Sequence, residues 1–532
     1  MTTERLWLRH VFSGGEATDF GPTSDAVPND AGVVSLPFLL NAENVIYEFD
    51  GGPHKVPGTS RLNSAALNSG AVIKGLFDYW DTGTGATSTQ HRIVHSGTTI
   101  MRDDADGTFS NLFTGLVSGA VPAYAVLEDL LVMANDALAD VPRSWDGTTA
   151  QNLAGTPPNF SFCVEHHNRM FAAGDEANSS RLYYSALLDA ADWVGGGSGF
   201  IDISPRDGDR ITGIISHRGE LIVFKGPYKG SIHRITGSAP TGSDAFARRP
   251  FARGIGAVGH NSLFTFRDDV GFMWSDGTIH SLKAVEIFQD YNRTALSWPI
   301  HGWIRDHVNF GRLKHAWAVD WPEFGFVLFA LPIDASSDNN IVRMMDYRFE
   351  PVRWAQWPAF STPGSLALVV DPADNDRRIV MEGGTDGFVR KYGQPNRAID
   401  GLTAINFRAT TPFLSYATPV AMKTIGGGSL GLQPKNDGNV VFGWTRDNNA
   451  QQTQNVSQGG ADVLAPADAN QFTLGTSTLG GARFVDRFFE LETGGEFRSI
   501  SMDVTNNVIN EDVELHSISA IVERGAWSLE ND

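Results

Sequence analysis

Short runs of residues with strand character recur along most of this sequence, in sets of three or four. Runs such as RITGIISH, ELIVFKG and SIHRITG are rich in apolar and β-branched residues and are separated by turn residues, which is typical of antiparallel strands. Each set takes about 35 to 60 residues. A set this small cannot bury both of its faces alone, so neighbouring sets must pack on one another. The sequence therefore predicts an all-β fold, with a β-propeller of about six or seven antiparallel blades over residues 41–395.

The pattern changes on both sides of this range. Residues 396–532 contain longer alternating strands, among them GNVVFGWTRD and DVELHSISAIVER, separated by loops rich in Gln, Asn and Gly. This pattern predicts a C-terminal β-sandwich-like domain of adequate size for its own core. Residues 1–40 show little periodicity, and we expect them to form an N-terminal docking arm.

The most frequent repeated signal is the dipeptide Asp-Gly, placed just before or between predicted strands. We interpret these pairs as two-residue hairpin turns, because Asp and Gly both tolerate the positive φ that such turns require. Some have an aromatic residue nearby, as in SWDGTT and WSDGTI. The structural turn residues predicted in this way are Asp106, Gly107, Asp146, Gly147, Asp276, Gly277, Asp386 and Gly387, and Asp50-Gly51 has the same pattern.

Composition and charge exclude several classes of protein. The chain has 41 Lys and Arg against 61 Asp and Glu, a net charge of -20, and no basic block that would suit a reader of duplex DNA. A single cysteine, Cys163, allows no internal disulfide and no cysteine-based zinc site. The most apolar stretch, FGFVLFALPI, is too short to span a membrane, and no secretory signal is visible at the N-terminus.

No motif in the sequence carries a recognisable chemistry. The glycines Gly254, Gly256 and Gly259 have the spacing of a dinucleotide loop, but we expect no helix after them. No HExxH pair and no G-x-S-x-G elbow between a strand and a helix is present, and the acidic loop at residues 371–376 lacks the EF-hand pattern. We therefore expect no catalytic residues, no metal site and no cofactor, and the binding residues stay unassigned.

An alternative function follows from the Asp-Gly turns with nearby aromatic residues, which are similar to the Asp-boxes of sialidase-type propellers. A sialidase also needs an arginine cluster and a tyrosine nucleophile, and the sequence nominates neither. The alternative is thus a carbohydrate-acting or carbohydrate-binding propeller, either a glycosidase or a receptor-binding module.

Three stretches of the sequence resemble a more specific family. NAENVIYEFDGGPHKVPGTSRL combines an Asn-rich entry, a strand, a glycine turn and a Pro-Gly pair, and GSIHRITG leads through RPFARGIGAVGHNSLFTF to VGFMWSDGTIHSL. These runs resemble the hub and nozzle proteins of tailed bacteriophages, especially those with short tails. The C-terminal run from TPFLSYATPVAMKTI to VELHSISAIVERG is similar to the sandwich-like ends of such chains.

The resemblance implies a non-enzymatic structural protein of the virion. It would form a homo-oligomeric ring in the tail, as a hexamer, and would connect the portal and adaptor proteins to the distal tail proteins or fibres. The ring would enclose the channel through which DNA is ejected, and its acidic charge would let the DNA slide without sequence-specific binding. Localisation would be the virion tail, assembled in the host cytoplasm, with no membrane span.

Overall fold

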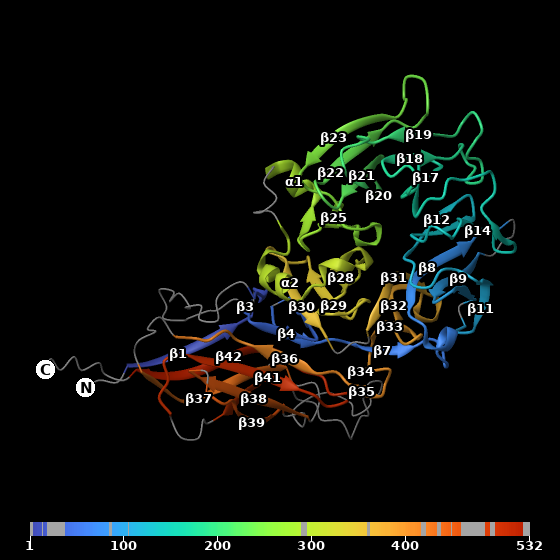
Figure 1. Ribbon diagram of the computed structural model, residues 1–532. Helices are drawn as coiled ribbons and strands as arrows, with labels where there is room; N and C mark the ends of the chain where they lie inside the picture. Colours follow the sequence, from blue (N-terminus) through green and yellow to red (C-terminus); the bar gives the residue numbers. More distant parts are fainter. Residues whose placement is uncertain are drawn as a thin grey trace. The chain divides into compact units, whose positions relative to one another are not determined.

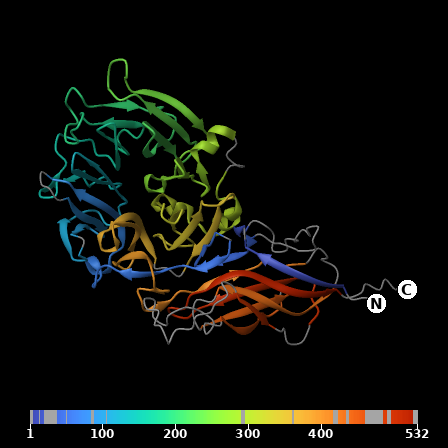
Figure 2. The same cartoon turned by 180° about the vertical axis from the view of Figure 1, so that it is seen from behind.

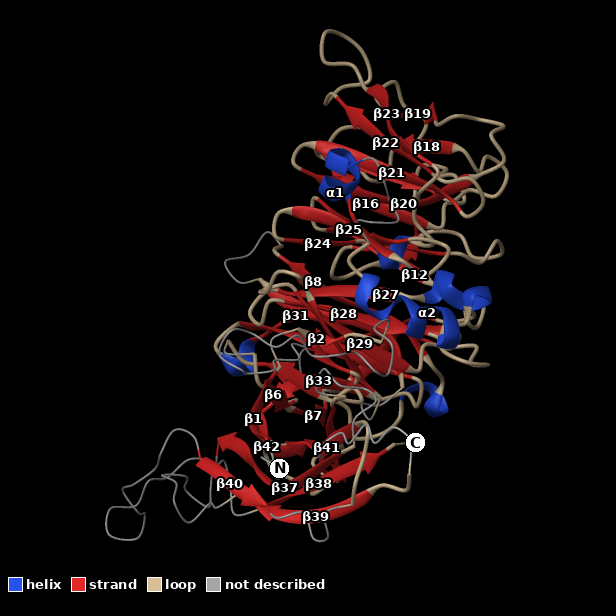
Figure 3. Ribbon diagram, turned by 90° about the vertical axis from the view of Figure 1, so that its left-hand side faces the viewer, coloured by secondary structure: helices blue, strands red, loops and turns tan. Residues whose placement is uncertain are grey.

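A computed structural model describes residues 4–524 with the exception of 13, 19–37, 50, 84–87, 105, 289–294, 359–361, 416–421, 434–437, 448, 459–484 and 490–494. Strands dominate the described part of the chain and helices are few and short (Figure 3). The predicted all-β class with a propeller is therefore confirmed. None of the described helices is long and apolar enough to cross a membrane.

The chain forms two compact units, each described here by itself. The propeller unit comprises residues 60–343 and 361–392, and the sandwich unit comprises residues 1–59, 344–360 and 393–532. These ranges differ from the predicted boundaries. The propeller unit begins at residue 60 rather than 41, and residues 1–40 belong to the sandwich unit together with the C-terminal part of the chain.

Seven consecutive sheets, called sheets 1 to 7 below, make up the propeller unit, and each begins with the strand nearest the centre (Figure 1). Their strands are, in order: β8 (Ile73–Asp81), β9 (Thr89–Ser96), β10 (Thr99–Asp103), β11 (Phe109–Phe113); β12 (Pro122–Leu127), β13 (Leu130–Asn135), β14 (Arg143–Trp145), β15 (Ala150–Asn152); β16 (Phe162–His166), β17 (Arg169–Ala173), β18 (Arg181–Tyr184), β19 (Gly199–Asp202); β20 (Arg210–His217), β21 (Glu220–Gly226), β22 (Ser231–Thr236), β23 (Ala247–Arg253); β24 (Phe264–Phe266), β25 (Asp269–Met273), β26 (Ile279–Ser281); β27 (Trp317–Trp321), β28 (Phe326–Leu331), β29 (Ile341–Asp346); and β31 (Pro363–Asp371), β32 (Arg377–Gly384), β33 (Val389–Gln394) with β7 (Gly58–Arg61).

Apolar clusters between neighbouring sheets hold the ring together. Tyr79 and Ile93 of sheet 1 pack with Leu131 and Trp145 of sheet 2, and similar clusters join sheets 2 to 3, 3 to 4 and 4 to 5. The ring closes because the cluster around Ile73 joins sheet 1 to sheet 7. In sheet 7 the outermost strand is β7, which comes from the N-terminal side, so hydrogen bonds between distant parts of the chain complete this blade.

Short helices connect some of these strands. They are η1 (Leu67–Gly70), η2 (His260–Ser262), α1 (Leu282–Phe288), η3 (Trp298–Ile300), α2 (His301–His307), η4 (Phe310–His315) and η5 (Pro372–Asp374).

The sandwich unit has two main sheets, seen from behind in Figure 2. The first has the order β40 (Val485–Phe489), β37 (Lys423–Gln433), β42 (Glu514–Arg524), β6 (Pro53–Lys55) and β5 (Val45–Tyr47), with β1 (Glu4–Val11) also paired to β42. The second has the order β30 (Arg353–Trp357), β4 (Asn41–Glu43), β36 (Phe407–Thr410), β41 (Ile500–Asn506), β38 (Asn439–Arg446) and β39 (Gln452–Ser457). Two small pairs, β2 (Gly15–Glu16) with β3 (Phe38–Leu39) and β34 (Ala398–Ile399) with β35 (Thr403–Ala404), complete the unit.

Candidate functional site

The predicted Asp-Gly turns lie in four different sheets of the propeller unit, at Asp106-Gly107, Asp146-Gly147, Asp276-Gly277 and Asp386-Gly387. At each of them the glycine has a positive φ, between +78° and +86°. At each of them the aspartate carboxylate accepts a hydrogen bond from the backbone N–H two residues later, at 2.7 to 3.3 Å. Their role as local turn residues thus has a direct geometric basis, and they do not form a common site.

The type of turn differs from the prediction. Only the glycines, and not the aspartates, have positive φ. In the hairpin at Gly277, the Trp274 N–H donates to Thr278 O at 2.8 Å and the Gly277 N–H donates to Trp274 O at 3.0 Å. The loop therefore has three residues, Ser275, Asp276 and Gly277, and the glycine is the left-handed residue at its end. At Asp50-Gly51, Asp50 lies outside the described residues.

The glycine-spaced loop and the acidic loop also have local structural explanations. Residues 254–259 follow the strand β23 and precede the single turn η2, so no helix N-terminus is available for a pyrophosphate. In the acidic loop, Asp371 Oδ2 accepts a hydrogen bond from Lys391 Nζ at 2.8 Å, and Asp374 pairs with Arg377 at 3.3 Å.

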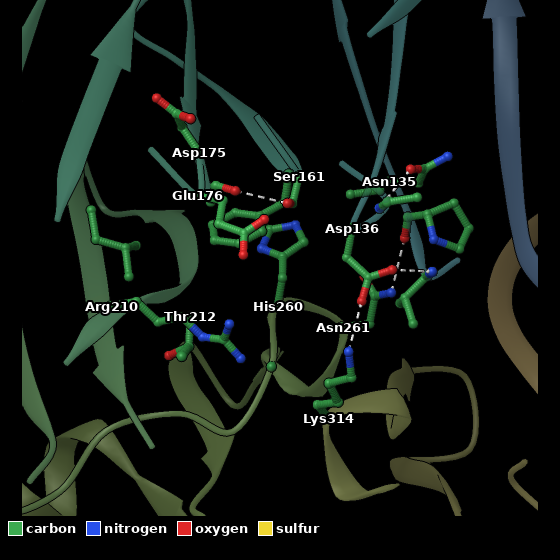
Figure 4. Close-up of a pocket in the computed structure, with 18 of the residues that line it drawn as sticks. Asn135, Asp136, Ser161, Asp175, Glu176, Arg210, Thr212, His260, Asn261 and Lys314 are labelled. Atoms are coloured by element: carbon green, nitrogen blue, oxygen red, sulfur yellow. Dashed lines mark hydrogen bonds and ion pairs between the residues drawn. The ribbon is translucent and has the colours of Figure 1, made fainter. Parts of the chain in front are cut away.

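A pocket of about 270 Å³ opens at one end of the propeller unit (Figure 4). It is formed by the loops that enter the first strands of sheets 2 to 6 and by the loops that leave the second strands of sheets 2 and 3. Loops at equivalent positions of successive blades reach the same end of the ring, so a central pocket results. Its polar lining includes Asn135, Asp136, Ser161, Asp175, Glu176, Arg210, Thr212, His260, Asn261 and Lys314.

Several of these polar groups already hold the loops together. Asp136 accepts hydrogen bonds from the Val121 N–H at 2.7 Å and from Lys314 Nζ at 3.0 Å. The Asn261 amide donates to Pro122 O at 3.0 Å. Asp136 therefore links the loops before and after the first two strands of sheet 2 to the loop that enters sheet 6.

Two further groups in the pocket have shifted pKa values. Burial works to raise the pKa of Asp175, but hydrogen bonds from Tyr183, Asn178 and the Ala177 N–H outweigh it, and the pKa is lowered. Burial lowers the pKa of His260 to about 4, so its ring is neutral at pH 7. The ring stacks on Phe162 with centroids 5.0 Å apart and planes 11° from parallel.

The side chains of Glu176 and Arg210 are exposed in the lining of the pocket, whereas the other two exposed charged groups described above, Asp136 and Lys314, are paired with each other. Glu176 and Arg210 are the residues there that are best placed to meet a ligand. Among the pocket residues, Gly259 of the glycine-spaced loop stands out in the sequence, but none of the polar side chains of the lining does. A signal was nevertheless present, because Asp136 and Asp175 lie at equivalent positions just after the second strands of two successive sheets.

The sandwich unit contains a group of three residues that could hold a metal ion, Glu48, His54 and Glu514, whose ligand atoms lie within 4.8 Å of one another. Both ring nitrogens of His54 already face carboxylates, with Nδ1 2.6 Å from Glu48 and Nε2 2.9 Å from Asp512. Burial works to lower the pKa of His54, but its bonds to Asp512 and Glu48 outweigh this and raise it. The arrangement is therefore a polar network that favours the protonated form of the His54 ring.

Cys163 is buried between sheets 2 and 3, and burial raises the pKa of its thiol to about 12. A thiol of this kind is not a reactive nucleophile at neutral pH.

No family model matches the sequence, and no curated protein matches it either. Solved structures with a similar arrangement include YCF48 bound to D1 peptide, with 12% identity, a TM-score of 0.37 and coverage of 64% of this chain and 97% of that one. Another is the gluconolactonase XC5397 from Xanthomonas campestris, with 11% identity, a TM-score of 0.33 and coverage of 69% and 97%. A third is an exo-beta-1,3-galactanase from Phanerochaete chrysosporium, with 8% identity, a TM-score of 0.28 and coverage of 88% and 100%. At these TM-scores the likenesses have no weight for the function of this chain.

Proposed function

We propose that this chain is a structural subunit of a bacteriophage tail, a hub or nozzle protein that assembles into a homo-oligomeric ring. The ring connects the portal and adaptor proteins to distal tail proteins or fibres and encloses the DNA exit channel. The protein is located in the virion tail after assembly in the host cytoplasm. It has no catalytic activity and needs no cofactor.

The observation that carries this proposal is the way in which the chain builds its two units. It passes from one unit to the other four times, at residues 59–60, 343–344, 360–361 and 392–393. One linker would be enough to append a binding module to an enzyme. The units are instead joined by several covalent crossings, and the last blade is completed by β7. Such a construction resists separation of the units by force, which favours a structural role. The stretch NAENVIYEFDGGPHKVPGTSRL, which carries the family resemblance, supplies β4, β5, β6 and β7.

The state of the polar groups in the pocket supports a non-enzymatic role. A general acid or base needs a pKa near the working pH and access to the reacting proton. His260 is held neutral by burial, with a pKa of about 4, and Asp175 and Asp136 are bound by structural partners. These groups stabilise the loops at the mouth of the propeller unit.

Mass photometry and negative-stain electron microscopy of the purified full-length chain test the proposal, alone and with the proteins encoded by the adjacent reading frames. The expected result is a closed ring of several copies that binds a portal or adaptor protein. A chain that stays monomeric with these partners and releases reducing sugar from a host polysaccharide would refute the structural role.

A carbohydrate-binding or carbohydrate-acting propeller is the second candidate, and the exposed side chains of Glu176 and Arg210 in the pocket favour it. Charged and amide side chains that line a pocket can bind several hydroxyl groups of a sugar. The test is sugar release and sugar binding by wild type and by Glu176→Gln and Arg210→Ala. Sugar-dependent activity lost in both variants, with unchanged melting temperatures, would favour this function over the structural one.

A further inference from the structure

Charge is unevenly distributed among the blades of the propeller unit. Residues 205–253, which contain sheet 4, have nine Lys and Arg against four Asp and Glu. Residues 117–204, which contain sheets 2 and 3, have three Lys and Arg against eleven Asp and Glu. A basic blade is thus present in a chain whose net charge is -20. This separation of charge marks two surfaces that would attract each other between copies.

The basic surface is the outermost strand of sheet 4. We call Arg248, Arg249 and Arg253 of β23 the basic edge, and all three are exposed. Arg248 Nη1 donates a hydrogen bond to Ser204 Oγ at 2.8 Å, which leaves the rest of its guanidinium available. Pro250, also exposed on this strand, has no N–H to donate, so the strand is poorly suited to main-chain pairing with another strand. Contact at this edge must therefore use the arginine side chains.

The side chain of His233 on β22 reports the positive potential of this blade. Its pKa is lowered to about 4, first by burial and then by the charges of Arg248 and Lys225, with Arg253 adding to the same direction. Asp207 acts in the opposite direction but does not cancel the effect. Basic groups thus converge around this part of sheet 4.

The acidic surface lies on sheets 1 and 2, and we call Asp81, Glu128, Asp129 and Asp146 the acidic rim. A Cβ added at Gly147 would lie 2.2 Å from Asp81 Oδ2, so the turn that carries Asp146 lies against Asp81. Thr82 Oγ1, next to Asp81, donates to Asp129 Oδ1 at 2.5 Å. Glu128 occupies the same two-residue turn as Asp129.

The hydroxyl of Tyr79 reports the negative potential of the rim. Its pKa is raised first by burial and then by the charges of Asp81, Asp129 and Asp146. Three of the four members of the rim therefore lie near the Tyr79 hydroxyl, which donates a hydrogen bond to Asp129 O at 2.5 Å.

We propose that the basic edge of one copy binds the acidic rim of the next copy. Two copies with a large net negative charge repel each other, and contact between oppositely charged surfaces is the arrangement that lowers this repulsion. Because the two surfaces differ, the contact is head-to-tail, and such contacts generate a ring when the rotation closes. The assignment rests on the proposed ring function and names the surfaces that form it.

Charge reversal tests the contact, with self-association of the full chain measured by sedimentation velocity and mass photometry at low and at high salt. We expect wild type to associate in a salt-sensitive way. The variant Arg248→Glu/Arg249→Glu is expected to associate at least about tenfold more weakly at low salt. The control Arg305→Glu/Arg312→Glu changes the net charge equally at other exposed arginines of the same unit and should associate like wild type.

A second variant, Glu128→Lys/Asp129→Asn, removes most of the negative charge of the acidic rim, and Asn at position 129 tolerates the positive φ of this turn. Alone it should also associate weakly. Mixed with Arg248→Glu/Arg249→Glu, it should give dimers without larger rings, because each variant retains one intact surface.

Three results would overturn the assignment. The first is a wild-type chain that stays monomeric at low salt, and the second is unchanged association of Arg248→Glu/Arg249→Glu. The third is binding of a DNA duplex by wild type that this variant loses, which would make the basic edge a nucleic-acid surface. Rings that persist in the variant would refute only this contact, whereas a wild type that forms no ring, even with portal or adaptor proteins, would refute the proposed function as well.

Discussion

Nε2 of His54 lies 2.9 Å from Oδ1 of Asp512, although 458 residues separate them in the sequence. Oδ2 of Asp512 accepts a hydrogen bond from Arg397 at 2.8 Å, and Nδ1 of His54 lies 2.6 Å from Glu48. His54 is buried, and its ring lies between the N-terminal strand β6 and the segment that enters β42. This pair therefore couples the two ends of the chain within the sandwich unit.

The stability of the sandwich unit should decrease as the pH rises above about 6.5. The pKa of folded His54 is raised, so its contribution is complete below the ordinary value of 6.5 and is lost as the pH rises through the higher folded value. The pKa of Asp512 is lowered, so its contribution is constant in this range. Burial lowers the pKa of Lys55 to about 8. The cost of keeping this ammonium group charged in the fold is therefore present below pH 8 and decreases above it, which acts in the opposite direction to His54 at that higher pH.

The measurement is the melting temperature of wild type and of His54→Gln between about pH 6 and pH 8. At pH 6 the variant should lose about 2 kcal/mol, because Glu48 and Asp512 lose their bonds to the charged ring, while Arg397 still pairs with Asp512. The difference should shrink toward pH 8. A difference that does not change with pH would show that His54 is neutral in the folded chain.

Lys225 provides a second test, in the propeller unit. Its side chain is fully buried, and Nζ donates to Asp207 at 2.7 Å and to the carbonyl of Ile203 at 2.8 Å. Lys225→Met should cost about 3 kcal/mol, because Asp207 and the carbonyl lose their donor. Addition of Asp207→Asn should recover part of the loss. Lys229→Met is the matched control, since Lys229 is exposed on the same hairpin, donates only from the surface to Asp207 O at 2.9 Å and should cost less than about 1 kcal/mol.

Chemical denaturation of the three variants would measure these changes in the free energy of unfolding. Equal stability of Lys225→Met and Lys229→Met would contradict the role of the buried ammonium.

The repeat of strands and Asp-Gly turns was enough to predict the propeller, because each blade is a local hairpin structure whose turns leave a signal in the sequence. The two-residue turns between first and second strands were not predicted. Leu127 pairs with Leu130 and His166 with Arg169, so Glu128-Asp129 and His167-Asn168 form these turns with positive φ at every residue. Asp, Asn and His tolerate positive φ, but without a glycine these pairs lack the strongest hairpin signal and were not recognised.

The strand pairing of the sandwich unit could not be predicted either, and the reason is different. Glu43 of β4 pairs with Arg408 of β36 and with Gln356 of β30. Strands of three to five residues carry too little pattern to specify partners that are hundreds of residues away. The pocket was missed because its polar residues come from several blades and are brought together only when the ring closes.

Gly277 offers the sharpest test of the predicted turns. Its φ is +80°, which costs a residue with a side chain about 1 to 2 kcal/mol. A Cβ at this position would lie 2.6 Å from Ile304 Cγ2, so Gly277→Val also creates a clash in a buried contact. We expect a loss of about 3 kcal/mol or more.

Gly115→Val separates the two effects. Gly115 has a φ of +77°, but no atom lies within 4 Å of the place that a Cβ would take there, so this variant should lose only the conformational part. Asp276→Ala should lose about 1 kcal/mol, since the Thr278 N–H loses its acceptor. Thermal and urea unfolding of the three variants check this order. Wild-type stability of both Gly277→Val and Asp276→Ala would show that this turn does not hold its blade together.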